Sequence, residues 1–252
     1  MAEKLDVLAL AAHPDDVELC CSGTLIKLKE QGNKTGIVDL TRGEKGTRGT
    51  PEQRLQEAEK AAKILGLTAR ENLGLPDTKL DNSTDYQKAI IKMIRKYRPH
   101  ICLINAPTDR HPDHGDAARL QLDSLFYSGL RMIETFDDQG NPQDIWRPAH
   151  TLHYMQARPF DPTFVFDVTG TVEQKKQAIL AFDSQFNHDH NKDDGPETYI
   201  SSSRFFESLF GRSQFYGQLI GAEHGEPFLY TQMNQPVPLN SFSVFHETSP
   251  MR

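Results

Sequence analysis

Short apolar runs alternate with amphipathic stretches through the first half of the chain. The apolar runs predict buried strands, because strands that are covered on both faces are hydrophobic throughout. The amphipathic stretches carry apolar residues every three or four positions, which is the period of a helix with one buried face. The predicted strands are residues 5–12, 35–40 and 100–105, and the predicted helices are residues 19–31, 51–65, 86–97 and 116–127.

Local signals support the helix at residues 51–65. Thr50 precedes Pro51 and Gln53, the pattern of an N-cap, a proline in the first helical position and a capping box. Gly66 suits the left-handed residue that ends many helices. Helices of this length between short strands indicate right-handed βαβ units. We therefore expect an α/β fold, a Rossmann-like sandwich with a mostly parallel sheet flanked by helices.

The second half of the chain is less regular. It shows neither an internal repeat nor a long linker, so we expect a single domain over residues 1–252. We expect the tail after about residue 232 to be extended, as chain ends often are. The predicted strands here are residues 152–156 and 164–168, the predicted helices residues 172–182 and 199–210, and a polar loop covers residues 187–196.

Composition narrows the classes of function. The formal net charge of −7 over 252 residues disfavours a nucleic acid or an anionic membrane as partner. No run of about 18 apolar residues predicts a membrane span, and the N-terminal apolar run is too short for a signal peptide. Cys20, Cys21 and Cys102 form no CxxC motif, so we expect reduced thiols and a cytoplasmic protein.

Two loops repeat histidine, proline and aspartate in close order. HPDD (residues 13–16) follows the first predicted strand, and HPDH (residues 111–114) follows the strand at residues 100–105. Either motif alone would suit an ordinary turn or a helix entry. Because ligands bind beyond the carboxyl ends of parallel strands, both loops are expected at the same functional edge.

The residue types in these loops predict a metal site. Imidazole and carboxylate ligands suit zinc, and catalytic zinc sites use three protein ligands with one open position. We predict that His13, Asp16 and His114 hold one Zn²⁺ per chain. Asp15 beside the metal can then take a proton from a water whose pKa zinc lowers to about 7.

His111 is the predicted acid of the same site. Its neighbour Asp113 is expected to raise the pKa of the imidazole and to hold it as a cation. Such a cation can stabilise an oxyanion or protonate a departing amine. A metal, a base and an acid together predict hydrolysis of an amide.

These motifs resemble a known family. HPDDVE and HPDH are similar to the two signature motifs of the LmbE/PIG-L family of zinc-dependent N-acetylglucosamine-type deacetylases. The segments DLTRGEKGTRGT (residues 39–50) and RENLGLPD (residues 70–77) resemble its bacillithiol-pathway branch, which deacetylates N-acetylglucosaminyl malate. The resemblance extends from residue 5 to about residue 217, and it implies a homo-oligomer in a bacterial cytoplasm.

The resemblance also implies roles for individual residues. It gives zinc ligation to His13, Asp16 and His114, general-base catalysis to Asp15, assistance at the tetrahedral intermediate to His111, and orientation of that imidazole to Asp113. It implies that Arg54 contacts substrate, that Arg110 contacts the malate carboxylates, and that Tyr199 closes over the acetyl group.

Three alternatives remain open at this point. The substrate can be another acetylated sugar, such as a chitooligosaccharide or another thiol conjugate. The chain can be a sugar-binding relative without catalysis, although the complete set of histidines and aspartates disfavours this. A nucleotide-binding module is disfavoured because the first strand–helix turn contains no GxGxxG to cradle phosphate.

Overall fold

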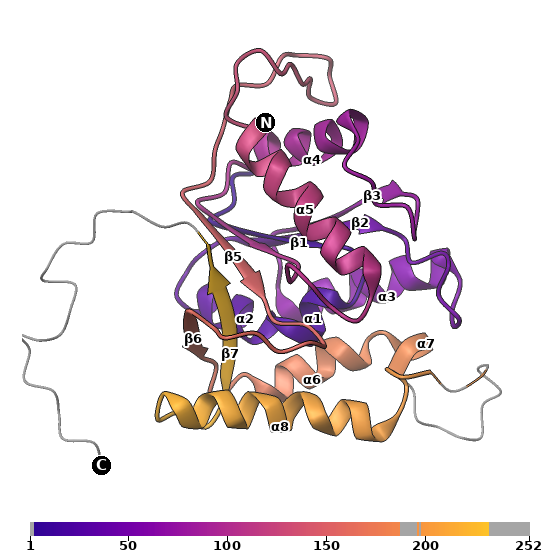
Figure 1. Ribbon diagram of the computed structural model, residues 1–252, viewed down its shortest axis with the longest axis vertical. Coiled ribbons are helices and arrows are strands. Elements are labelled where there is room, and N and C mark those ends of the chain that lie inside the picture. The colour runs from indigo at the N-terminus through magenta and orange to yellow at the C-terminus, as the bar shows by residue number, and fades with distance from the viewer. Residues whose placement is uncertain (1–2, 187–195, 197, 232–252) are drawn as a thin grey trace, which may run out of the picture.

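A seven-stranded sheet forms the centre of the protein (Figure 1). The computed structural model describes residues 3–186, 196 and 198–231. The strands lie in the order β3-β2-β1-β4-β5-β7-β6. The neighbours from β3 to β5 pair in parallel, and β7 runs antiparallel to β5 and β6. The expected mostly parallel sheet is confirmed. The strands are β1 (Val7–Ala11), β2 (Thr35–Thr41), β3 (Ala69–Leu75), β4 (Ile101–Ile104), β5 (His150–Tyr154), β6 (Phe164–Asp167) and β7 (Gly225–Tyr230).

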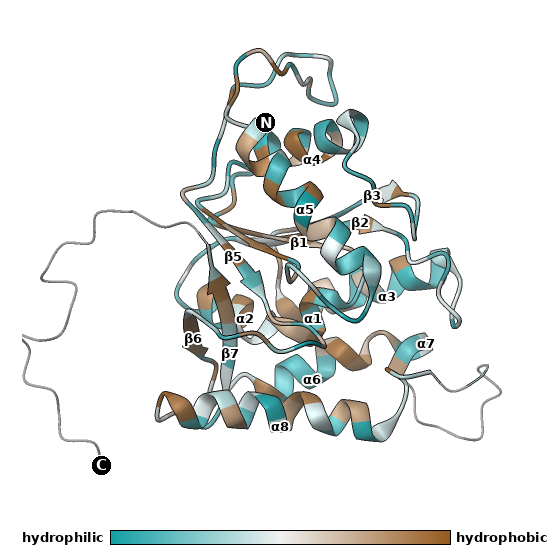
Figure 2. Cartoon of the chain, viewed as in Figure 1, coloured by the Kyte–Doolittle hydropathy of each residue, from teal (hydrophilic) through white to brown (hydrophobic). Residues whose placement is uncertain are grey.

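Helices cover both faces of the sheet, as the α/β prediction requires (Figure 1). α4 and α5 pack on one face around Leu8 and Ile94. The other helices pack on the opposite face, around Tyr154 and Phe182. Apolar and polar bands alternate along α8 (Figure 2), as expected for a helix with one buried face. The helices are α1 (Asp16–Cys20), α2 (Ser22–Glu30), α3 (Pro51–Leu65), α4 (Thr84–Tyr97), α5 (Pro112–Tyr127), α6 (Val172–Leu180), α7 (Asp183–Phe186) and α8 (Ser203–Leu219).

Several elements depart from the sequence prediction. The helix expected at residues 19–31 is divided at Cys21, so α1 and α2 meet at a break. Glu226 caps the start of α2 by accepting hydrogen bonds from the backbone N–H groups of Gly23 and Thr24. The sequence prediction missed β3, α7 and β7. The expected extended tail and residues 187–195 of the expected polar loop lie outside the described residues.

The strand order creates a natural ligand-binding edge. β1 pairs with β2 on one side and with β4 on the other. The strands after β1 are therefore added first on one side of β1, as β2 and β3, and then on its other side, beginning with β4. Ligands in open α/β sheets bind at such a switch point, beyond the carboxyl ends of the strands. The HPDD loop leaves β1 and the HPDH motif lies between β4 and α5, so both motifs reach this position. Among the described helices, none is both long enough and apolar enough to cross a bilayer.

Candidate active site

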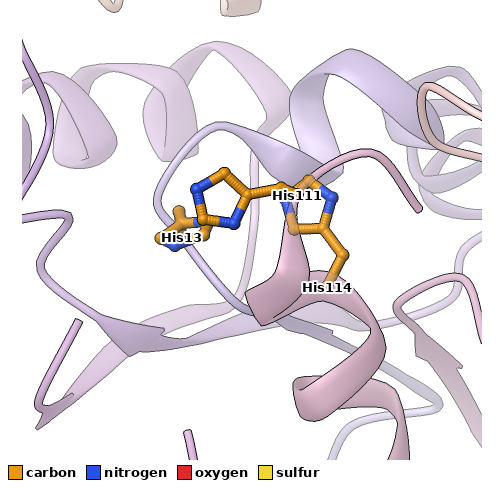
Figure 3. Close-up of side chains that lie close together, drawn as sticks. All are labelled: His13, His111 and His114. Atoms are coloured by element: carbon orange, nitrogen blue, oxygen red, sulfur yellow. The ribbon is translucent and has the colours of Figure 1, made fainter. Parts of the chain in front are cut away.

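Three histidines from the two motifs gather at the switch point (Figure 3). The ring of His13 lies 4.8 Å from that of His111 and 5.5 Å from that of His114, centroid to centroid. A cavity of about 280 Å³ opens beside them, lined by residues of both motifs, of the loops after β2 and β3, and of α8. The structure therefore brings the two predicted loops together in one pocket.

Asp15 occupies an unusual backbone conformation in this pocket. Its φ of 118° lies in the left-handed region, where a residue with a side chain is strained by about 1–3 kcal/mol. Its carboxylate accepts a hydrogen bond from Arg54 at 3.0 Å, and the same guanidinium donates to the carbonyl of Pro14. Burial raises the pKa of Asp15 to about 7, while the charge of Arg54 acts in the opposite direction.

Asp16 lies between two of the imidazoles. Its Oδ1 is 3.1 Å from Nε2 of His114, and its Oδ2 is 3.8 Å from Nδ1 of His13. Burial would raise the pKa of Asp16, but the charge of His114 and its hydrogen bond hold that pKa well below the usual range. The three predicted metal ligands thus converge, with one ring nitrogen of each histidine facing the same carboxylate.

The second ring nitrogen of each of these histidines bonds to another carboxylate. Nε2 of His13 lies 3.3 Å from both Asp77 and Asp113, and Nδ1 of His114 lies 2.6 Å from Asp109. Burial would lower the pKa of His13, but the hydrogen bonds to Asp113 and Asp77 raise it to about 10. Metal-ligating histidines usually donate their other N–H to a carboxylate in this way.

The donor set fits a divalent metal. Five aspartate carboxylates lie beside three imidazoles in a largely buried space. A bound cation would offset the negative charge of these carboxylates. His13, Asp16 and His114 offer the mixed nitrogen and oxygen ligands that zinc accepts. Among the described residues, two groups bring three possible donor atoms within 4.8 Å of one another: His13 with Asp77 and Asp113, and His13 with His111 and His114. The predicted set with Asp16 is not one of these groups, because His13 and His114 face different oxygens of that carboxylate. In the set with Asp16, a carboxylate lies behind the ring of each histidine.

His111 departs from the electrostatic prediction. The carboxylate of Asp113 bonds to His13 and to the backbone N–H of Thr78, whereas only the backbone N–H of Asp113 donates to Nδ1 of His111. Burial lowers the pKa of His111, and the charges of His13 and His114 lower it further. The expected rise in the pKa of His111 is therefore not found, since Asp113 raises this pKa less than burial and the two histidines lower it.

The predicted substrate contacts all line the pocket. The guanidinium of Arg110 lies over the ring of Tyr199, 4.5 Å from its centroid, and both side chains are exposed. Arg54 is buried, and its bonds to Asp15 and Pro14 give it a partner within the protein. Its contact with substrate stays a prediction.

Sequence reasoning missed further residues of the site. Asp77 ends the segment RENLGLPD, and Asp109 lies two positions before the second motif, so the neighbouring motifs were an available signal for both. Arg212 reaches the pocket from the middle of α8, and no local pattern marks it. Asn105 and Gln156, which contact Asp16, follow β4 and β5 as isolated polar residues.

Comparisons with known proteins identify similar deacetylases. A family model described as "PIG-L: GlcNAc-PI de-N-acetylase" matches residues 8–124. A diacetylchitobiose deacetylase of Thermococcus kodakarensis is 30% identical over 193 residues, which are 73% of this chain and 71% of that protein. A probable N-acetyl-α-D-glucosaminyl L-malate deacetylase of Bacillus anthracis is 28% identical over 199 residues, covering 74% of this chain and 84% of that protein.

Solved structures give the same result. A conserved protein of Thermus thermophilus superposes with a TM-score of 0.79 at 35% identity, covering 93% of this chain and 98% of that one. The fold, the two motif loops and these relatives together show that the chain belongs to the PIG-L/LmbE family of deacetylases, which are amide hydrolases.

Proposed function

We propose that this protein uses zinc to hydrolyse the N-acetyl group of an N-acetylglucosamine conjugate. The preferred substrate is N-acetyl-glucosaminyl-malate, which would yield glucosaminyl-malate and acetate in bacillithiol biosynthesis. The observation that carries the proposal is the position of Asp16 between His13 and His114, with Asp15 beside them in the pocket.

In this proposal His13, Asp16 and His114 hold one zinc ion. When bound, zinc supplies a Lewis acid that polarises an amide carbonyl and lowers the pKa of a water molecule. Asp77 and Asp113 fix the ring of His13 from behind. Asp109 does the same for His114.

Asp15 acts as the general base. Its backbone is in the strained left-handed conformation, and its carboxylate bonds to Arg54. The carboxylate of Asp15 therefore does not lie with Asp16 between the histidines. A carboxyl group whose pKa lies at about 7 is suited to accept a proton at neutral pH. It removes a proton from the attacking water as the new C–O bond forms at the acetamide carbonyl.

His111 stabilises the oxygen of the tetrahedral intermediate as a neutral donor. Because the backbone N–H of Asp113 donates to Nδ1, the ring proton is left on Nε2. A fixed N–H donor is sufficient for an oxyanion, so a cationic ring is not required. The proton held by Asp15 then passes to the nitrogen as the C–N bond breaks, which releases acetate and the free amine.

Cations in the pocket support an acidic aglycone. Lys45, Arg110 and Arg212 line the pocket in addition to Arg54, and a guanidinium can bind a carboxylate through two hydrogen bonds. The name of the Bacillus anthracis relative also supports the malate conjugate. A neutral diacetylchitobiose is the second candidate, favoured by the Thermococcus kodakarensis relative.

A comparison of the two substrates tests the proposal. We expect the zinc-loaded protein to release acetate from N-acetylglucosaminyl malate with a higher kcat/KM than from diacetylchitobiose. Arg110→Gln should raise KM about tenfold for the malate conjugate, since a charged hydrogen bond of about 1.5 kcal/mol is lost, and should leave chitobiose turnover unchanged. Faster release from diacetylchitobiose would overturn the malate assignment, and release from neither would support a binding protein without catalysis.

The proposal includes a reducing compartment and a homo-oligomer. Cys20, Cys21 and Cys102 are free and buried, which suits a cytoplasmic protein. Light scattering coupled to gel filtration measures the number of chains, and a single-chain mass would contradict the homo-oligomer.

A further inference from the structure

Three amide side chains form a buried network behind Asp16. Asn105 and Gln121 are fully buried, and Gln156 is 3% exposed. Asn105 donates to Oδ2 of Asp16 at 3.2 Å, and Gln156 donates to Oδ1 at 3.2 Å. Two neighbouring strand ends, after β4 and β5, therefore hold both oxygens of one carboxylate.

The backbone sets the direction of every amide in this network. The backbone N–H of Asn105 donates to Oε1 of Gln121, so the NH₂ group of Gln121 donates to Oδ1 of Asn105, at 2.8 Å. This leaves the NH₂ group of Asn105 for Asp16 and Gln156. The backbone N–H of Ala106 donates to Oε1 of Gln156, which directs that NH₂ group to Asp16. A flipped amide would place two donors or two acceptors together, so the network has one orientation.

Further contacts anchor the backbone of this network. His153, which is buried, bonds through Nδ1 to the carbonyl of Asn105 at 2.6 Å. Arg212 donates to the carbonyl of Gln156. Buried amides are costly unless their hydrogen bonds are satisfied, and satisfied networks are rigid. The network therefore holds Asp16 in one position.

Neutral donors suit a carboxylate that must also face a dication. An arginine or lysine here would stabilise ionised Asp16 but would repel the metal. Amide N–H groups stabilise the same ionised form and add no net charge. Asn105 and Gln156 thus stabilise ionised Asp16 without adding a positive charge that would repel the metal.

We propose that Asn105 and Gln156 are positioning residues that set the affinity of the site for Zn²⁺ by holding both oxygens of Asp16. This inference rests on the ligand set of the proposed function. It assigns the two amides no contact with substrate. Outer-shell partners of metal ligands typically contribute about 10–100-fold in affinity, and we expect an effect in that range.

Zinc affinity of the full chain, measured by competition with a chromophoric chelator, tests this inference. Gln156→Met should bind Zn²⁺ about 10–100-fold more weakly than the parent. Saturating zinc should restore its kcat with an unchanged substrate KM, a split that a folding defect would not produce. Gln185→Met is the matched control, because Gln185 is another buried pocket glutamine that bonds to Arg48 and Ser184 instead of Asp16.

A second variant keeps the test decisive if Gln156→Met does not fold. Gln156→Asn retains the amide but is one methylene shorter, so it should lose the bond to Asp16 and weaken zinc binding similarly. Parental zinc affinity in a folded Gln156 variant would overturn the inference. If the parent binds zinc and Gln156→Met weakens it but neither releases acetate, the inference stands and the proposed function is wrong.

Discussion

Gly43 allows a direct test of how Arg54 supports the site. Gly43 is buried in the loop after β2 and has a φ of 66°. A Cβ atom at this position would lie 2.0 Å from Nη1 and 2.6 Å from Cζ of Arg54. Contact between such atoms needs roughly 3.5 Å, so Gly43→Ala must displace the guanidinium by about 1.5 Å. That displacement breaks the 3.0 Å bond between Arg54 and Asp15.

The expected magnitude follows from this displacement. A misplacement of about 1 Å near a reacting group can cost about 100-fold in rate, equivalent to about 2.7 kcal/mol. The left-handed backbone adds a stability cost of about 1–2 kcal/mol for alanine. We therefore expect Gly43→Ala to lower kcat by about 100-fold and to lower the free energy of unfolding by at least about 1 kcal/mol.

Gly140→Ala separates these two effects. Gly140 also has a positive φ, 82°, but it is exposed and a Cβ there would meet no atom within 4 Å. It should show the backbone cost in urea denaturation and retain parental acetate release. Equal kcat values for Gly43→Ala and Gly140→Ala would refute the reasoning that Arg54 must stay beside Asp15.

The remaining predictions concern the metal and the helix that carries Arg54. Asp16→Asn should lose zinc, as measured by elemental analysis, whereas Asp77→Asn should retain zinc with about 10–100-fold weaker binding. Loss of zinc from Asp77→Asn but not from Asp16→Asn would favour the donor set of His13 with Asp77 and Asp113. Dialysis against a chelator should abolish acetate release, and added Zn²⁺ should restore it; activity that survives complete metal removal would contradict the metal site. Thr50→Ala removes the side chain that caps α3 and should lower the free energy of unfolding by about 1 kcal/mol in urea, with no change if the cap is unimportant.

Local sequence signals predicted the elements that depend on local chemistry. α3 begins and ends where Thr50, Pro51 and Gly66 indicate, with Thr50 accepting from the backbone N–H of Gln53. Strong apolar runs likewise located β1 and β2. These features are encoded by neighbours in the sequence and need no tertiary information.

The missed elements depend on tertiary contacts instead. β3 (Ala69–Leu75) is a mostly half-buried edge strand, and its polar residues bond to distant partners, such as Arg70 with Glu18 and Asp39. β7 contains a proline, and it pairs with strands far earlier in the chain. No local pattern signals such pairings.

The candidate site also combines residues that local motifs predict with residues that only the tertiary structure brings together. The two HPD motifs predicted that His13, Asp15 and His114 lie together, and the structure places them in one pocket. Arg212 joins that pocket through the fold alone. The direction of the pKa shift of His111 could not be judged from its neighbour Asp113 in the sequence, because burial and two other imidazoles lower that pKa.

Zinc content and acetate release, measured on one preparation of Asp15→Asn beside the parent, test the central claim most directly. Asparagine tolerates the left-handed backbone of this position, so the variant should fold and bind one zinc per chain. Because it cannot accept the proton of the attacking water, its acetate release from N-acetylglucosaminyl malate should fall by about 100–10,000-fold. Parental turnover by the zinc-loaded variant would contradict the account.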